Sequence, residues 1–187
     1  MQTEFKRLKR RPFLVPLVLP LVLVALLAVM AIWVFDARAT SIIIVVPNAE
    51  TEVTQATSTN PALSDAGQLR AKHLQQFLDK AKPSRGIDVV YVSEGLATQQ
   101  TAAPVAAGMG LAVNVIPNAM WPRLQHIISR DHSGEVILVV ATADKIKTYL
   151  AQAGVGEVNM DAGDSVSVFV ISRSSLSKKA MVRLRYD

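Results

Sequence analysis

The sequence predicts a layered α/β domain preceded by one transmembrane helix. Residues 12–35 contain no charged or amide side chain, and from Ser41 onward short runs rich in β-branched residues alternate with longer helical segments. Half of the 187 residues are hydrophobic and the mean hydropathy is +0.29, which excludes a disordered chain. We therefore expect a basic tail at 1–11, the helix at 12–35, a linker at 36–40 and the domain at 41–187.

The apolar segment at 12–35 is long enough to cross a bilayer core, which takes about 20 residues. The tail before it carries +4 of the chain's net charge of +5, and basic residues beside a transmembrane helix mark the cytoplasmic side. We expect a single-pass protein of the cytoplasmic (inner) membrane with a periplasmic domain. The alternative is a signal peptide cleaved after Ala39, but the apolar region of a signal peptide is shorter, about 7–15 residues.

The charge of the remaining chain excludes a nucleic-acid partner. Beyond the tail there are 15 basic and 14 acidic side chains, too balanced for a phosphate-binding surface. The chain has no cysteine, so it has no thiolate metal site. We expect His73 to be packed in the domain and His126 and His132 to be exposed, without a carboxylate at metal-ligand spacing. We therefore expect no metal and no cofactor.

Apolar runs and helix-end residues predict the strands and the helix in the first half of the domain. SIIIVV at 41–46 is continuously apolar, which is typical of a buried strand. Ser64 is a good N-cap for a helix with apolar residues on one side, and Pro83 ends that helix. IDVVYV at 87–92 is the second expected strand.

The second half continues the alternation of helices and strands. Small residues at 98–109 indicate a helix that contains Pro104, and the apolar run VILVVA indicates another buried strand. The last two strands are expected to form a hairpin at the sheet edge. The expected strands lie at 112–116, 136–141, 165–171 and 180–185, and the expected helices at 98–109, 121–129 and 144–153.

Five segments also keep the order and spacing of known motifs. They are VVPNAE at 45–50, NPALSDAGQLRAKHL at 60–74, VSEGLATQQTAAPVA at 92–106, VVATAD at 139–144 and RLRY at 183–186. Together they resemble the patterns VRHAE, NPPLSxAGxxRAxxL, VSExxRTQQTAxPxA, VVGHSN and RLRY of the histidine phosphatase superfamily. The resemblance implies the phosphoglycerate mutase-like fold, a three-layer α/β/α sandwich with its pocket at the carboxyl ends of the strands.

The same resemblance implies that the catalytic residues are missing. In the family a histidine attacks phosphorus, while two arginines and a second histidine hold the phosphoryl oxygens. These positions fall on Asn48, on Pro47 and Ala97, and on Thr142. The amide nitrogen of Asn48 has no free lone pair, Pro47 and Ala97 carry no guanidinium group, and Thr142 carries no charge.

Three further residues are candidates for the lining of this pocket: Ser93, Glu94 and Asp144. We expect a membrane-anchored, catalytically inactive protein that acts as a binding, regulatory or assembly module at the cell envelope, with a membrane or envelope protein as its partner. Two alternatives stay open. The same cleft could hold an active phosphatase or other hydrolase rewired around Asn48, Thr142 or Ser93, or another face of the domain could dock the partner. As a binding module, the cleft could also take a small-molecule ligand.

Overall fold

The computed structural model describes residues 15–38, 40–52, 59–81, 86–156, 158–161, 163–174 and 179–186. The chain divides into two compact units, Met1–Ala37 and Arg38–Asp187, which are described separately below. The predicted tail at 1–11 and the start of the predicted transmembrane segment lie outside the described residues.

The first unit holds helix α1 (Val15–Arg38), whose side chains from 18 to 34 are all exposed. Within the described residues, no helix is long and apolar enough to cross a membrane. The span predicted at 12–35 stays a prediction. The helix continues to Arg38, into the range expected to be a linker at 36–40.

The second unit is built on a six-stranded mixed sheet in the order β3-β2-β4-β1-β5-β6. Strand β1 pairs parallel with β4, and β4 and β3 pair parallel with β2. Strand β5 pairs antiparallel with β1 and with β6, which forms the predicted edge hairpin. The strands are β1 (Ser41–Pro47), β2 (Val89–Ser93), β3 (Val113–Ile116), β4 (Val136–Ala141), β5 (Ser167–Arg173) and β6 (Ala180–Arg185).

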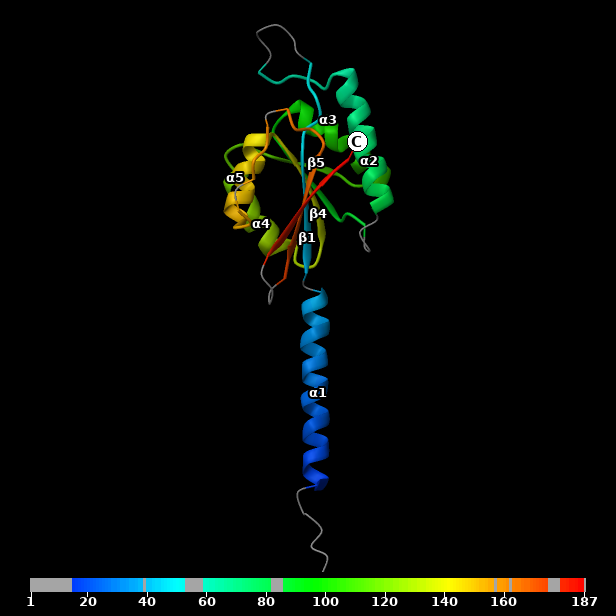
Figure 1. Cartoon of the computed structure of the whole chain (residues 1–187), viewed down its shortest axis with the longest axis vertical. Helices are drawn as coiled ribbons and strands as arrows, with labels where there is room; N and C mark the ends of the chain where they lie inside the picture. Colours follow the sequence, from blue (N-terminus) through cyan, green and yellow to red (C-terminus); the bar gives the residue numbers. More distant parts are fainter. Residues whose placement is uncertain are drawn as a thin grey trace, which may run out of the picture. The chain divides into compact units, whose positions relative to one another are not determined.

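Helices cover both faces of this sheet (Figure 1). Helices α2 (Asp65–Ala81) and α3 (Leu96–Met109) pack on one face, where Leu74, Leu78 and Val105 join the even-numbered residues of β1. The other face carries η1 (Trp121–Arg123), α4 (Leu124–Asp131) and α5 (Ala143–Ala153). The three-layer order is therefore the predicted one, and β4 and β1, which is apolar except for Ser41, lie in its centre.

The boundaries differ from the predicted ones by a few residues, with local causes. Helix α3 begins at Leu96 rather than at residue 98, because Gly95 is extended and serves as its N-cap. The segment predicted as one helix at 121–129 starts with a 3-10 turn that has Pro122 in its first positions.

The start of α2 is fixed directly onto the loop that follows β1. The Ser64 hydroxyl donates to the carbonyl oxygen of Glu50 (3.2 Å) and accepts from the N–H of Gly67 (3.1 Å), as expected of an N-cap. A Cβ atom on Gly67 would lie 2.0 Å from the Glu50 carbonyl oxygen. Only glycine fits this approach, which brings α2 against the end of β1.

Candidate functional site

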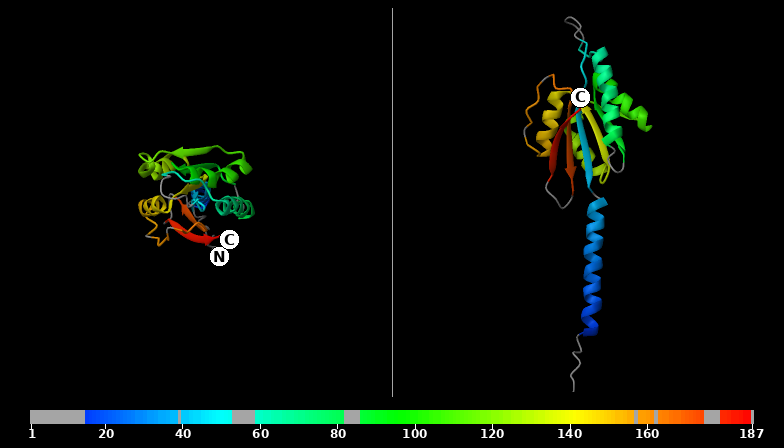
Figure 2. Two further views of the ribbon diagram at one scale, coloured as in Figure 1. Left: turned by 90° about the horizontal axis from the view of Figure 1, so that it is seen from above. Right: turned by 45° about the vertical axis from the view of Figure 1, so that its right-hand side comes forward.

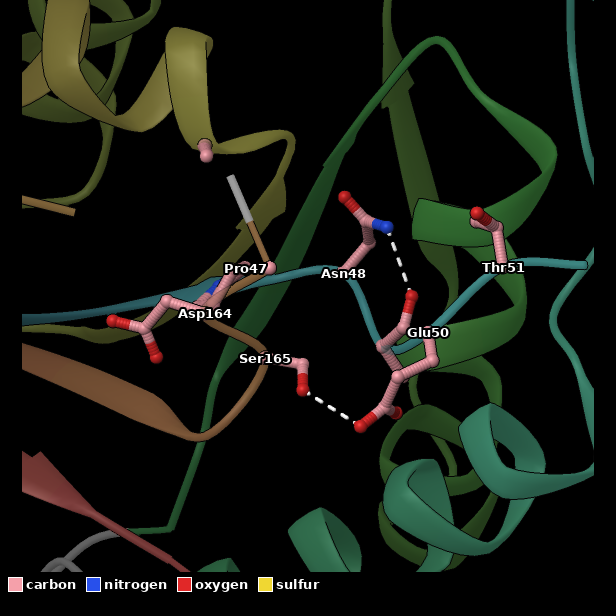
Figure 3. Close-up of a pocket in the computed structure, with 9 residues that line it drawn as sticks. Pro47, Asn48, Glu50, Thr51, Asp164 and Ser165 are labelled. Atoms are coloured by element: carbon pink, nitrogen blue, oxygen red, sulfur yellow. Dashed lines mark hydrogen bonds between the residues drawn. The ribbon is translucent and has the colours of Figure 1, made fainter. Parts of the chain in front are cut away.

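A pocket of about 240 Å³ lies beyond the carboxyl end of β1 (Figure 3). One wall is the chain from Pro47 to Thr51, and the opposite wall is the segment 163–165 that leads into β5. Ala143, at the start of α5, completes the lining. The pocket is where an α/β sheet places its ligands, as the resemblance implied.

Asn48 is the residue that the motif resemblance assigned to the nucleophile position, and it lines the pocket. Its backbone N–H donates to Ala141 of the neighbouring strand β4 (3.0 Å), which prolongs the pairing of β1 with β4. Its side-chain nitrogen donates to the carbonyl oxygen of Ala49 (2.9 Å). Asn48 is half-buried, and its side-chain amide is fixed by this hydrogen bond to the adjacent backbone. The amide offers no nucleophilic atom to a ligand.

Glu50 joins both walls of the pocket to α2. Its carboxylate accepts hydrogen bonds from Ser165 Oγ (2.8 Å) and from Arg70 Nε (3.1 Å), and Arg70 Nη2 lies 3.0 Å away. Burial acts to raise the pKa of Glu50, but hydrogen bonds from its own N–H, Arg70 and Ser165 outweigh burial and lower the pKa. Glu50 is thus an anion at neutral pH.

Asp164 is the second carboxylate of the lining. It accepts hydrogen bonds from Ser167 Oγ (2.7 Å) and from Arg183 of β6. Burial acts to raise its pKa, but these two partners and the N–H of Val166 together lower it. The side chain is 8% exposed, and its Oδ1 is buried without a hydrogen-bond partner among the described residues.

These charges invert the polarity that phosphate binding needs. Two carboxylates belong to the lining, and the described lining contains no arginine, lysine or histidine. The guanidinium groups of Arg70 and Arg183 are engaged by Glu50 and Asp164 and are not lining residues. An anionic phosphoryl group would therefore meet like charge without a compensating donor fork.

Ala97 is close to this loop but lies in the core. It is 7% exposed and packs with Ala49, Leu63 and Ala71. Its carbonyl oxygen accepts from Thr101 Oγ1 (2.7 Å), which in turn accepts from the N–H of Ala49 (3.0 Å). The start of α3 is thus bonded to the pocket loop, although Ala97 itself does not belong to the lining.

The other predicted residues are not brought together. Thr142 is exposed and precedes α5 without a side-chain cap bond, and Asp144 is exposed in the first turn of that helix. Ser93 is 1% exposed, with no partner for its hydroxyl among the described residues. Glu94 is exposed and accepts from the N–H of Asn118 (3.0 Å). None of the four lines the pocket at the end of β1.

Two histidines differ from expectation. His73 is exposed, because the buried stripe of α2 runs through Gly67, Ala71, Leu74 and Leu78 and bypasses it. His132 is half-buried, and its ring bonds to Tyr91 Oη and Glu135 Oε2, each at 2.7 Å. His126 is exposed, as predicted.

Sequence reasoning missed Glu50, Thr51, Asp164 and Ser165 as lining residues. Thr51 and Glu50 could have been found, because they follow Asn48 directly. Asp164 and Ser165 belong to no recognised motif and reach the pocket only because β5 pairs with β1.

Comparisons with known proteins agree with this architecture. A family model described as "Histidine phosphatase superfamily (branch 1)" matches residues 44–127. No curated protein matches the sequence.

Three solved structures are similar to this chain, with identities that show the fold alone. The protein histidine phosphatase SixA complexed with tungstate has a TM-score of 0.61 at 13% identity, covering 77% of this chain and 96% of that one. A putative alpha-ribazole-5'-P phosphatase from Escherichia coli has a TM-score of 0.58 at 16% identity, covering 78% and 96%. A phosphoserine phosphatase from Entamoeba histolytica has a TM-score of 0.55 at 13% identity, covering 72% and 95%.

Proposed function

We propose that this chain, a member of branch 1 of the histidine phosphatase superfamily, is a membrane-anchored protein without phosphatase activity that acts as a binding, regulatory or assembly module at the cell envelope. The observation that carries the proposal is the negative charge of the pocket lining. The lining holds ionised carboxylates where phosphate would need cations, and the motif resemblance assigns the nucleophile position to Asn48 of the same lining. Removing a single preorganised donor from such a site typically costs about 10²- to 10³-fold in rate.

The proposal extends to what the module recognises. The pocket walls present carboxylates, an amide and hydroxyl groups, which suit a ligand rich in hydrogen-bond donors better than a phosphate ester. A side chain of a membrane or envelope protein or a small molecule would satisfy this chemistry.

A phosphatase assay tests the loss of activity. The full chain is incubated with para-nitrophenyl phosphate, beside the Asn48→Ala variant and a heat-denatured sample. We expect no phosphate release above the denatured sample from either chain. Release by the native chain that disappears in Asn48→Ala would refute the proposal.

One contact favours a second candidate, a hydrolase with rewired residues in the same cleft. Ser165 Oγ donates to the Glu50 carboxylate at 2.8 Å inside the pocket, which is the arrangement of a nucleophile beside a base. The lowered pKa of Glu50 makes it a weak base, so we rank this candidate second. If an esterase or phosphatase activity is found and Ser165→Ala abolishes it while Ser64→Ala does not, this candidate replaces the first.

Membrane anchoring needs its own experiment. The full chain and a chain lacking residues 1–35 are expressed in bacteria, and membranes are washed with alkaline carbonate. We expect the full chain to stay in the washed membranes and the shortened chain to leave them. Protease added to intact spheroplasts should cut the domain if it is periplasmic, and a protected domain would contradict the orientation.

A further inference from the structure

The strand β6 forms one edge of the sheet and leaves apolar side chains exposed. Within the described residues the strand order ends at β6, which is the outermost strand in Figure 2. Val182 is 55% exposed and Leu184 is 42% exposed, although both stand opposite residues of β5, Val170 and Val168, on the face that carries α2. An open edge with exposed apolar side chains is a template for a further strand.

The backbone pattern of β6 shows which residues would pair with that strand. The N–H of Tyr186 donates to the Val166 carbonyl oxygen (3.0 Å), so the even-numbered residues of β6 direct their backbone groups toward β5. Backbone groups alternate in direction along a strand. The N–H and C=O groups of Met181, Arg183 and Arg185 therefore point out of the sheet edge.

We propose that β6 pairs antiparallel with β6 of a second copy of this chain, with Arg183 opposite Arg183 of that copy. In this register Met181 faces Arg185 of the other copy, and each outward-pointing pair exchanges two backbone hydrogen bonds. Val182 then packs against Leu184 of the other copy, and the twofold axis repeats that contact. Both exposed apolar side chains are covered by one pairing, which makes the edge complementary to itself.

The charged side chains of β6 permit the register centred on Arg183 and disfavour the adjacent register centred on Val182. The Arg183 guanidinium is paired with Asp164 and also bonds to Ser167 Oγ and the Asn159 carbonyl oxygen, so its charge is already compensated. Centring the pairing on Val182 instead would place Lys179 opposite Arg185, and like charges directly opposite each other are destabilising.

The expected association is weak, and this decides how to detect it. A pairing of one short strand per copy buries less than the roughly 800 Å² per partner of a standard interface. A covalent trap is therefore more informative than a size measurement in dilute solution. The chain contains no cysteine, so single introduced cysteines report on one position each.

The trap uses Val182→Cys and Leu184→Cys in two full-length chains that carry different affinity tags. In the proposed register these residues form a non-hydrogen-bonded pair with Cα atoms about 4.5 Å apart, within disulfide range. In a chain carrying either cysteine alone, the equivalent residues are diagonal neighbours about 7–8 Å apart, beyond that range. We expect co-expression and mild oxidation to link the two tags several-fold more than either variant links to itself.

Val115→Cys is the matched control, because Val115 is as exposed as Leu184, at 42%, and lies in β3 at the opposite edge of the sheet. The proposal is overturned if the mixed chains do not link, if Val115→Cys links to itself as strongly, or if Val182→Cys alone links best.

A second measurement guards against distortion by the cysteines. Val182→Lys in the full chain should weaken self-association in detergent roughly tenfold, because two symmetry-related apolar pairs are lost, with an unchanged circular dichroism spectrum. Unchanged association of a folded Val182→Lys chain would also overturn the proposal. Neither experiment depends on whether the pocket binds a ligand.

Discussion

Gly67→Ala tests whether the close contact between α2 and the pocket loop holds the site together. The new Cβ would lie 2.0 Å from the Glu50 carbonyl oxygen, where real Cβ contacts stay beyond 3.0 Å, so the two backbones must separate by about 1 Å. The movement pulls on the Ser64 cap and on the ion pair of Glu50 with Arg70.

The magnitude follows from opposing effects. Overpacking typically costs about 1–3 kcal/mol, and the strained hydrogen bonds add about 1 kcal/mol. The higher helix propensity of alanine stabilises the folded state by about 0.5–1 kcal/mol and offsets part of this loss. The net loss is about 2 kcal/mol, which lowers the Tm by roughly 4–8 °C in a protein of this size.

The assay is thermal unfolding of the full chain, followed by the change in tryptophan fluorescence as the buried Trp121 becomes exposed; Trp33 is exposed already in the folded chain. Gly108→Ala in α3 is the matched control, since its new Cβ would meet only the flexible end of the Gln75 side chain of α2 (2.5 Å to Nε2). That variant should be neutral or more stable by up to about 1 kcal/mol. An equal or higher Tm for Gly67→Ala than for the native chain would refute the reasoning.

Three further predictions concern stability. Folding lowers the pKa of Glu50 and of Asp164 below the unfolded value of about 4. The two carboxylates therefore stabilise the fold above that pH, and this stabilisation is lost as the pH falls through their folded pKa values. The double variant Glu50→Gln, Asp164→Asn should lose less Tm than the native chain between pH 5 and pH 3. Thr98→Val should cost about 1–3 kcal/mol in urea unfolding, because the single proton of its buried hydroxyl is shared between the carbonyl oxygens of Ser93 and Gly95. Thr148→Val, exposed on α5, should stay within about 0.5 kcal/mol. Tyr91→Phe should lower the free energy of unfolding by about 0.5–1.5 kcal/mol, because the hydrogen bond between Tyr91 Oη and the His132 ring is lost. An unchanged urea midpoint would show that this hydrogen bond does not stabilise the fold.

The sequence by itself determined the helices and strands and showed which residue types stand at the motif positions. Continuous apolar runs predicted β1 and β4, because strands at the centre of a sheet are covered on both faces. The absence of a nucleophilic atom at Asn48 and of a guanidinium group at Ala97 was visible from the motifs, since the residue type alone decides which chemical groups a position carries.

The tertiary structure alone decided which groups meet at the pocket. Ser165 lies 115 residues from Glu50 and bonds to it only because β5 returns antiparallel beside β1. The same return joins Asp164 to Arg183, so that the lining, as far as the structure describes it, holds carboxylates and no basic side chain. Hydropathy periodicity records which face of each element is buried, but not the strand order, and contacts between distant residues depend on that order.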